Sequence, residues 1–213
     1  MDSLEQPDRG GVLGDRAPAP PLAGVVLCGG RSRRMGFDKA TIVFEGETLL
    51  HRALARLDTV CDPVMVAPGD MALTLTGRAS VADAARDSGP LGGLVTALRL
   101  SRHRLLAVVA VDLPWIDPRL LSLLAAAIGD HDVAVCETAN GIEPLHAVYA
   151  TSLLPAAEKA LAGHDRSMRH LIARSNALQV PESEWRKAGI SEAFSRNVNT
   201  PEDLEGISQD LLR

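Results

Sequence analysis

Aromatic residues are scarce in this chain and make up 3% of its 213 residues. Proteins that bind single-stranded nucleic acid stack bases on aromatic side chains, so that function is not expected. The net charge of -5 and the lack of a basic stripe also argue against a nucleic-acid partner. A phosphate site is still compatible with this composition, because a local cluster of cations can override the mean charge.

Cysteine is also rare, and the three cysteines, Cys28, Cys61 and Cys136, are widely spaced. Without a CxxC pair or a Cys/His metal pattern, they are expected to be buried, reduced thiols. No apolar run approaches the ~18 residues of a membrane-spanning helix. The first residues lack the basic start and apolar stretch of a secretion signal. We therefore expect a cytoplasmic protein with no membrane partner.

The composition changes once along the chain. Residues 1–22 are rich in Pro, Gly, Asp and Arg and show no hydrophobic periodicity, which is typical of a disordered tail. No internal repeat or second linker follows, so one domain is expected over residues 23–213. With 46% hydrophobic and 23% charged residues, the chain has the composition of an ordinary globular protein.

Short apolar runs alternate with amphipathic segments in this domain. The runs predict buried strands, and the segments with a helical repeat and a capping residue predict helices. The predicted strands are 24–28, 63–67, 80–82, 105–111, 133–136 and 145–150. The predicted helices are 48–57, 90–100, one opened by Asp117 and Pro118, 153–161 (ended by Gly163), 168–173 and one from Thr200. Such alternation predicts an α/β domain with a mostly parallel central sheet flanked by helices.

Ligands of such sheets bind beyond the carboxyl ends of the strands. The loop after the first strand is therefore a candidate ligand site. Gly29 and Gly30 let the backbone turn sharply, and their N–H groups can bind an anion. A backbone cradle with convergent cations suits a triphosphate, although a solvated basic loop would have the same composition. The spacing fits neither a P-loop nor GxGxxG. The cations of this loop are Arg31, Arg33, Arg34 and Lys39.

A carboxylate follows the most apolar run of the chain, 105–111. At the end of a buried strand, Asp112 would incur a large desolvation penalty unless a partner satisfied it. Mg²⁺ would do so, because it takes one or two carboxylates together with phosphate oxygens and waters. Capping of the next turn is the alternative role.

Two further segments could contact ligands. Residues 83–93 lead into a helix N-terminus, which favours anions, and Gly92 and Gly93 leave room for a base or for helix–sheet packing. Asn197 and Asn199 precede a capping box, so they fit turn chemistry as well as binding of a polar acceptor.

The remaining polar and aromatic side chains fit structural roles better. His146 lies in a predicted strand, where a histidine with satisfied partners is more common than a catalyst. The scattered Trp115, Trp185 and Tyr149 are expected to pack in the core.

The segment LCGGRSRRMGFDKA closely resembles the signature LAGGxSxRMGxDK of the molybdenum cofactor guanylyltransferases. GPLGGL, VDLPW, EPLHAVY and NVNTPEDL match this family in the same order, so the resemblance spans residues 23–206. It implies a single Rossmann-like nucleotidyltransferase domain, GTP as substrate, Mg²⁺ as cofactor and molybdopterin as acceptor. Molybdoenzymes or other cofactor-synthesis proteins would be its protein partners.

The resemblance also implies roles for matching positions. Lys39 and Arg34 would contact phosphate, and Asp112 would hold Mg²⁺. Cys28 stands where the family pattern usually has Ala, a small change that keeps the backbone. The implied catalytic set is Lys39, Arg34 and Asp112. The implied binding set is Leu27, Cys28, Gly29 and Gly30 with Lys39 for the nucleotide, Asp83 for guanosine, Gly89 in the GPLGG segment, and Asn197 and Asn199 on the acceptor side.

Several alternatives share part of this pattern. A sister group transfers CMP to the same acceptor, but it tends to carry LAAG in the first loop and lacks the GPLGG-type segment. Another phosphorylated acceptor would fit the same motifs. A non-catalytic nucleotide-binding carrier would not need Lys39 or a metal-placing Asp112. A dehydrogenase would need GxGxxG, which is missing.

Overall fold

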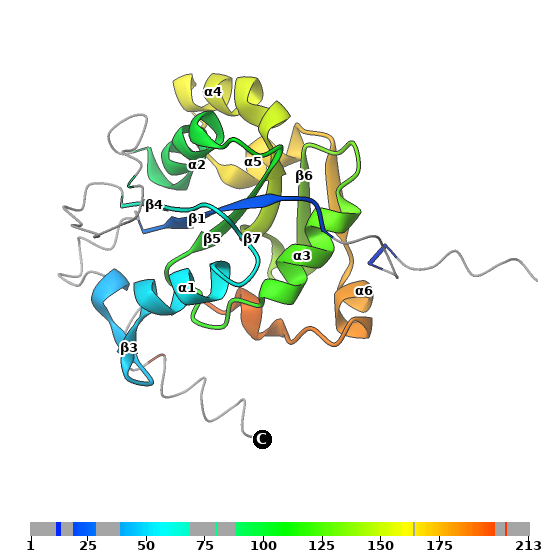
Figure 1. Cartoon of the computed structure of the whole chain (residues 1–213). Helices are drawn as coiled ribbons and strands as arrows, with labels where there is room; N and C mark the ends of the chain where they lie inside the picture. Colours follow the sequence, from blue (N-terminus) through cyan, green and yellow to red (C-terminus); the bar gives the residue numbers. More distant parts are fainter. Residues whose placement is uncertain are drawn as a thin grey trace, which may run out of the picture.

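The computed structural model of the chain describes residues 12–13, 19–28, 39–68, 80, 88–163, 165–198 and 203. These residues form a six-stranded sheet, in the order β4-β1-β5-β7-β6-β8, and a separate two-stranded hairpin, β2-β3 (Figure 1). The strands are β1 (Leu22–Leu27), β2 (Val43–Phe44), β3 (Glu47–Thr48), β4 (Val64–Ala67), β5 (Leu105–Ala110), β6 (Val133–Thr138), β7 (Gly141–Ala150) and β8 (Ala177–Val180). The helices are η2 (Lys39–Thr41), α1 (Leu49–Leu57), α2 (Gly89–Leu100), α3 (Pro118–Ala127), η3 (Thr151–Leu153), α4 (Leu154–Ala162), α5 (Met168–Ala173), α6 (Glu182–Lys187) and η4 (Glu192–Ser195).

The central sheet is mostly parallel, as predicted. β1 pairs in parallel with β4 and β5, and β6 pairs in parallel with β8. Only β7 among these strands is antiparallel to its neighbours, β5 and β6. It follows β6 through a tight hairpin, a connection that only antiparallel strands can make. The predicted α/β class is confirmed.

Helices cover both faces of the sheet. One apolar cluster joins it to α1, α3 and the segment around Trp185 and Phe194, and a second joins it to α2, α4 and α5. Figure 1 shows these two sets of helices on opposite sides of the strands. Every residue of β1 and β5 is buried because both faces are covered. This burial explains why their sequences are continuously apolar rather than alternating.

Three helix ends lie at the capping residues that the sequence predicts. The Thr48 side chain accepts the backbone N–H of His51 and caps the start of α1. Asp117 caps α3 in the same way, with Pro118 in the first turn. Gly163 is the C-cap of α4. These caps satisfy backbone groups that have no partner inside the helix.

Other boundaries differ from the prediction. Leu22, inside the predicted tail 1–22, is the first residue of β1, and Leu13 packs in the core with 7% of its surface exposed. Of the predicted strand 80–82, only Ser80 is described, and it forms an isolated bridge with Val66. The predicted helix from Thr200 lies outside the described residues apart from Asp203, which is helical. The sequence does not predict the short elements β2, β3, β8 and α6, because they are too short to show a hydrophobic repeat.

No helix within the described ranges is long and apolar enough to cross a membrane.

Candidate active site

Lys39 and Asp112 meet beyond the carboxyl end of β5. Lys39 begins η2, and Asp112 follows β5 after one intervening residue. The Lys39 Nζ atom lies 2.6 Å from Asp112 Oδ2, and the two side chains are only 14% and 21% exposed. Water screens such a pair less than a surface pair, so the attraction is stronger. Two residues of the implied catalytic set are thus in direct contact.

An aromatic contact joins the segments that carry these two residues. Phe44 of β2 and Trp115, which follows Asp112, have ring centroids 5.5 Å apart at an interplanar angle of 71°. The Arg52 guanidinium also contacts Phe44, 4.7 Å from its ring centroid, and pairs with Glu45. This packing holds the hairpin after Lys39 against the segment after Asp112.

The carboxy-terminal segment also reaches Asp112. The Val198 N–H donates a hydrogen bond of 2.9 Å to the backbone carbonyl of Asp112. Asn197, the preceding residue, is exposed. The structure therefore brings Asn197 and Asp112 into neighbouring segments, as a shared site requires. Asn199 lies outside the described residues.

His146 of β7 holds the far end of the segment after Asp112. Its Nε2 atom accepts the backbone N–H of Asp117 at 3.1 Å, and its side chain is fully buried. Burial lowers the pKa of His146 to about 4, against the opposing effects of its own backbone carbonyl and the Asp117 carboxylate. The sequence predicts a histidine with satisfied partners, but Nδ1 has no hydrogen-bond partner among the described atoms.

Glu143 is a carboxylate near the site to which the sequence assigns no role. The β5–β7 register ends at Val109 and His146, and Asp112 and Glu143 each lie three residues beyond that pair. Burial raises the pKa of Glu143, as does the Asp112 charge, while the Leu145 N–H and the Arg169 charge lower it. The available signal is a carboxylate just before a proline that precedes the predicted strand 145–150, because Pro144 cannot donate to a strand ladder. The β6–β7 register does shift near this point.

The end of β1 opens toward the same edge. The Leu27 carbonyl accepts the Val111 N–H at 3.0 Å, and the Cys28 N–H donates to the Ala67 carbonyl at 2.9 Å. The predicted nucleotide loop therefore starts between β4 and β5. Gly89 begins α2 with φ of +58°, a conformation that suits glycine. The other predicted site residues, Gly29, Gly30, Arg34 and Asp83, lie outside the described residues.

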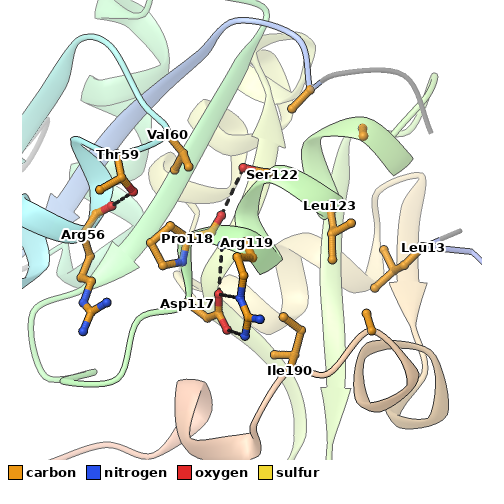
Figure 2. A pocket seen from close by; sticks show the side chains of 13 residues that line it. Leu13, Arg56, Thr59, Val60, Asp117, Pro118, Arg119, Ser122, Leu123 and Ile190 are labelled. Atoms are coloured by element: carbon orange, nitrogen blue, oxygen red, sulfur yellow. Dashed lines mark hydrogen bonds and ion pairs between the residues drawn. The ribbon is translucent and has the colours of Figure 1, made fainter. Parts of the chain in front are cut away.

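A separate hollow of about 910 Å³ lies between α3, the end of α1 and the amino-terminal Leu13 (Figure 2). None of the predicted site residues that the structure describes lines it. Three charged side chains line it, Asp117, Arg119 and Arg56, and Asp117 and Arg119 bind each other at 2.7 Å, as Figure 2 shows. The carboxylate and one of the two guanidinium groups of this hollow are thus already paired with each other.

The donor atoms of the described residues suit a metal ion that is shared with substrate phosphates. In the described part of the chain, no three His, Cys, Asp or Glu side chains are grouped to hold a metal. A structural zinc site would need such a group. Mg²⁺ keeps several waters and uses one or two carboxylates with substrate phosphates. The partly buried Asp112, beside a cation and near a second carboxylate, fits that requirement.

The chain is similar to known proteins in sequence and in fold. The MobA-like NTP transferase domain family matches residues 24–180. A probable molybdenum cofactor guanylyltransferase of Opitutus terrae is 36% identical over 201 residues, covering 89% of this chain and 96% of that protein. The molybdopterin-guanine dinucleotide biosynthesis protein A of Archaeoglobus fulgidus superposes with a TM-score of 0.74 at 23% identity, covering 89% of this chain and 98% of that one. A Mycobacterium tuberculosis protein crystallised with manganese has a TM-score of 0.55 at 17% identity, covering 79% of this chain and 97% of that one.

The likeness to the two solved structures concerns the fold. The family match and the identity to the Opitutus protein each extend over most of the chain. The chain therefore belongs to the MobA-like NTP transferases, within the molybdenum cofactor guanylyltransferase family, and is a nucleotidyltransferase.

Proposed function

We propose that this enzyme transfers GMP from GTP to the phosphate of molybdenum-bearing molybdopterin, releasing pyrophosphate and forming molybdopterin guanine dinucleotide. The observation that supports it most is the contact between Lys39 Nζ and Asp112 Oδ2, 2.6 Å long, at the carboxyl end of the sheet. Nucleotidyl transfer needs a phosphate-binding cation beside a metal-placing carboxylate, and these two residues supply both.

In the proposed reaction, an oxygen of the acceptor phosphate attacks the α-phosphorus of GTP. A new P–O bond forms while the bond to the oxygen that bridges to the β-phosphate breaks, and pyrophosphate leaves with that electron pair. The attacking phosphate is already ionised near neutral pH, so no strong general base is needed. This fits a site whose carboxylates can serve in metal and substrate binding instead.

Each protein group has a defined part in this proposal. Lys39, with Arg34 and the N–H groups of the loop after β1, would neutralise charge on the pyrophosphate leaving group. Asp112 would hold Mg²⁺, which when bound supplies positive charge to the bridging phosphate oxygens. Asn197 and Asn199 would bind the acceptor, and the Val198–Asp112 bond of 2.9 Å supports this placement next to the metal position.

The Asp112→Asn variant tests the assignment directly. It keeps the shape of the side chain but removes its charge, so transfer of GMP should fall by roughly 10²-fold or more while the protein stays folded. Pyrophosphate release with GTP, Mg²⁺ and molybdopterin measures the rate. Asp130→Asn, an exposed aspartate after α3, is the matched control and should keep full activity. Normal transfer by Asp112→Asn would show the assignment to be wrong.

Nucleotide preference is tested by thermal shift with GTP, CTP and ATP in the presence of Mg²⁺. A ligand at ~100 times its Kd stabilises the folded state by about 2.7 kcal/mol. A shift with GTP that Lys39→Ala abolishes would support the proposal. A shift with CTP alone would instead assign the enzyme to CMP transfer.

A further inference from the structure

The imidazole of His146 contacts two segments of the candidate site, at Asp117 and at Phe194. Its Nε2 atom is 3.1 Å from the backbone N of Asp117, which donates the hydrogen bond. Only a lone pair can accept an N–H, so Nε2 is unprotonated and the ring proton is on Nδ1. Burial lowers the pKa of His146 to about 4, which keeps the ring neutral at physiological pH. The histidine is therefore a fixed hydrogen-bond acceptor.

The first segment runs from Asp112 to Asp117. At its start, Leu113 N–H donates to the Ala110 carbonyl at 3.2 Å, and at its end Asp117 N–H donates to His146. Between them, Trp115 contacts Phe44. The bond to His146 thus fixes the end of a short loop whose first residue is the proposed metal ligand.

The second segment is the one that ends at Asn197 and Val198. Phe194 of η4 packs on His146 with ring centroids 5.2 Å apart, and on Trp185 at 5.4 Å. A few residues later, Val198 N–H donates to the Asp112 carbonyl at 2.9 Å. His146 therefore touches both segments at the ends away from the point where they bond to each other.

We infer that His146 is a positioning residue, which holds the Asp112 segment and the Asn197 segment in one arrangement through the Asp117 N–H and the Phe194 ring. The inference rests on the proposed function, because that function assigns Asp112 to the metal and Asn197 to the acceptor. His146 itself does not act on the substrate. Its effect is on how well the metal side and the acceptor side of the site are aligned.

The cost of burying an imidazole supports this role over simple packing. A buried polar atom without a partner is unfavourable, and His146 Nδ1 has none among the described residues. A leucine would fill a similar volume without that cost. What leucine cannot do is accept the Asp117 N–H, so this bond is what the histidine adds.

Three variants separate the hydrogen bond from general stability. His146→Leu removes the acceptor and leaves the Asp117 N–H without a partner. His146→Gln places a carboxamide oxygen that can replace Nε2 as acceptor. Leu161→Ala is the control, because it opens a cavity in α4 under the other face of the sheet and lowers stability without touching either segment.

Steady-state pyrophosphate release and Mn²⁺ binding, followed by electron paramagnetic resonance, provide the functional readout. Small displacements of reacting groups can cost about 10- to 100-fold in rate, so kcat of His146→Leu should fall by about that factor. The KM for GTP should change little, because the nucleotide loop follows β1. Mn²⁺ binding should weaken, and His146→Gln should recover most of both properties. Leu161→Ala should melt earlier but keep kcat at temperatures where it is folded.

Amide hydrogen exchange tests the coupling without any activity. In His146→Leu, the amides of both Asp117 and Val198 should exchange faster than in wild type. In Leu161→Ala, their exchange relative to that of the sheet amides should be unchanged. Faster exchange at Asp117 alone, or a His146→Leu enzyme with normal kcat and Mn²⁺ binding, would overturn the inference. If His146→Leu speeds exchange at both amides but the wild-type protein transfers no nucleotide, the proposed function is overturned and the anchoring role of His146 stands.

Discussion

The Nζ atom of Lys39 and the Oδ2 atom of Asp112 lie 2.6 Å apart, although 73 positions separate the two residues in the chain. Each charge is partly buried, so the contact with the opposite charge offsets part of its desolvation. Substrate phosphates would offer Lys39 a further partner, and a metal ion would offer one to Asp112. Binding of GTP and Mg²⁺ should therefore change the contact between Lys39 and Asp112.

A double-mutant cycle should show strong coupling within this pair. Charged hydrogen bonds that are partly buried contribute about 1.5–3 kcal/mol, so Lys39→Met and Asp112→Asn should destabilise by less together than the sum of their single effects. Urea denaturation measures each free energy of unfolding. The control pair is Arg99 and Glu158, which is also 2.6 Å apart but is 50% and 41% exposed. Its coupling should be about 0.2–1 kcal/mol. Equal coupling in the two pairs would contradict the importance of partial burial.

The aromatic contact near the site should matter for the rate. Phe44→Leu loses the edge-to-face packing on Trp115, worth about 0.5–1.5 kcal/mol beyond the buried area. Because this contact holds the hairpin after Lys39, we expect transfer to slow by about tenfold as well. Val43→Ala is the neighbouring control, since Val43 is 63% exposed, and it should behave like wild type. Reduced stability with an unchanged rate would limit Phe44 to a packing role.

Stability should depend on the charge state of His146. The pKa of His146 is lowered from 6.5 to about 4 in the folded protein, so its contribution to stability is fully present above pH 6.5. As the pH falls from there toward 4, the unfolded chain binds a proton that the folded chain does not. The free energy of unfolding should lose up to about 1.4 kcal/mol per pH unit from this group. His146→Gln should remove that part of the slope in urea titrations, and an unchanged slope would contradict the assignment.

Glu143 should have the opposite pH signature. Burial raises its pKa above the ordinary value of 4.5, so its contribution to stability is greatest at low pH and is lost as the pH rises through the raised pKa. Glu143→Gln cannot ionise, and its stability relative to wild type should therefore increase as the pH rises from 4 toward neutral. Thermal melting across that range measures the difference. A constant difference in stability across this pH range would mean that burial does not raise the pKa of Glu143.

Much of the fold could be predicted because its signals are local. The continuous apolar runs of β1 and β5 indicate strands buried on both faces, and the Thr48 and Asp117 caps mark the starts of α1 and α3. Short elements such as β8 and α6 gave no such signal, because their few buried residues are held by contacts with distant segments. Leu13 is a similar case, since one buried side chain in a polar segment shows no periodicity.

The sequence by itself determined the α/β class, the order of the main elements and the choice of Lys39 and Asp112 as candidate site residues, because period, caps and residue type are properties of neighbouring positions. Only the tertiary structure decided that these two side chains are in contact, that Glu143 lies at the same end of the sheet, and that β7 is reversed. It likewise decided which N–H the buried His146 accepts. Such relationships depend on strand register and side-chain packing between segments far apart in the chain, and a local pattern does not encode them.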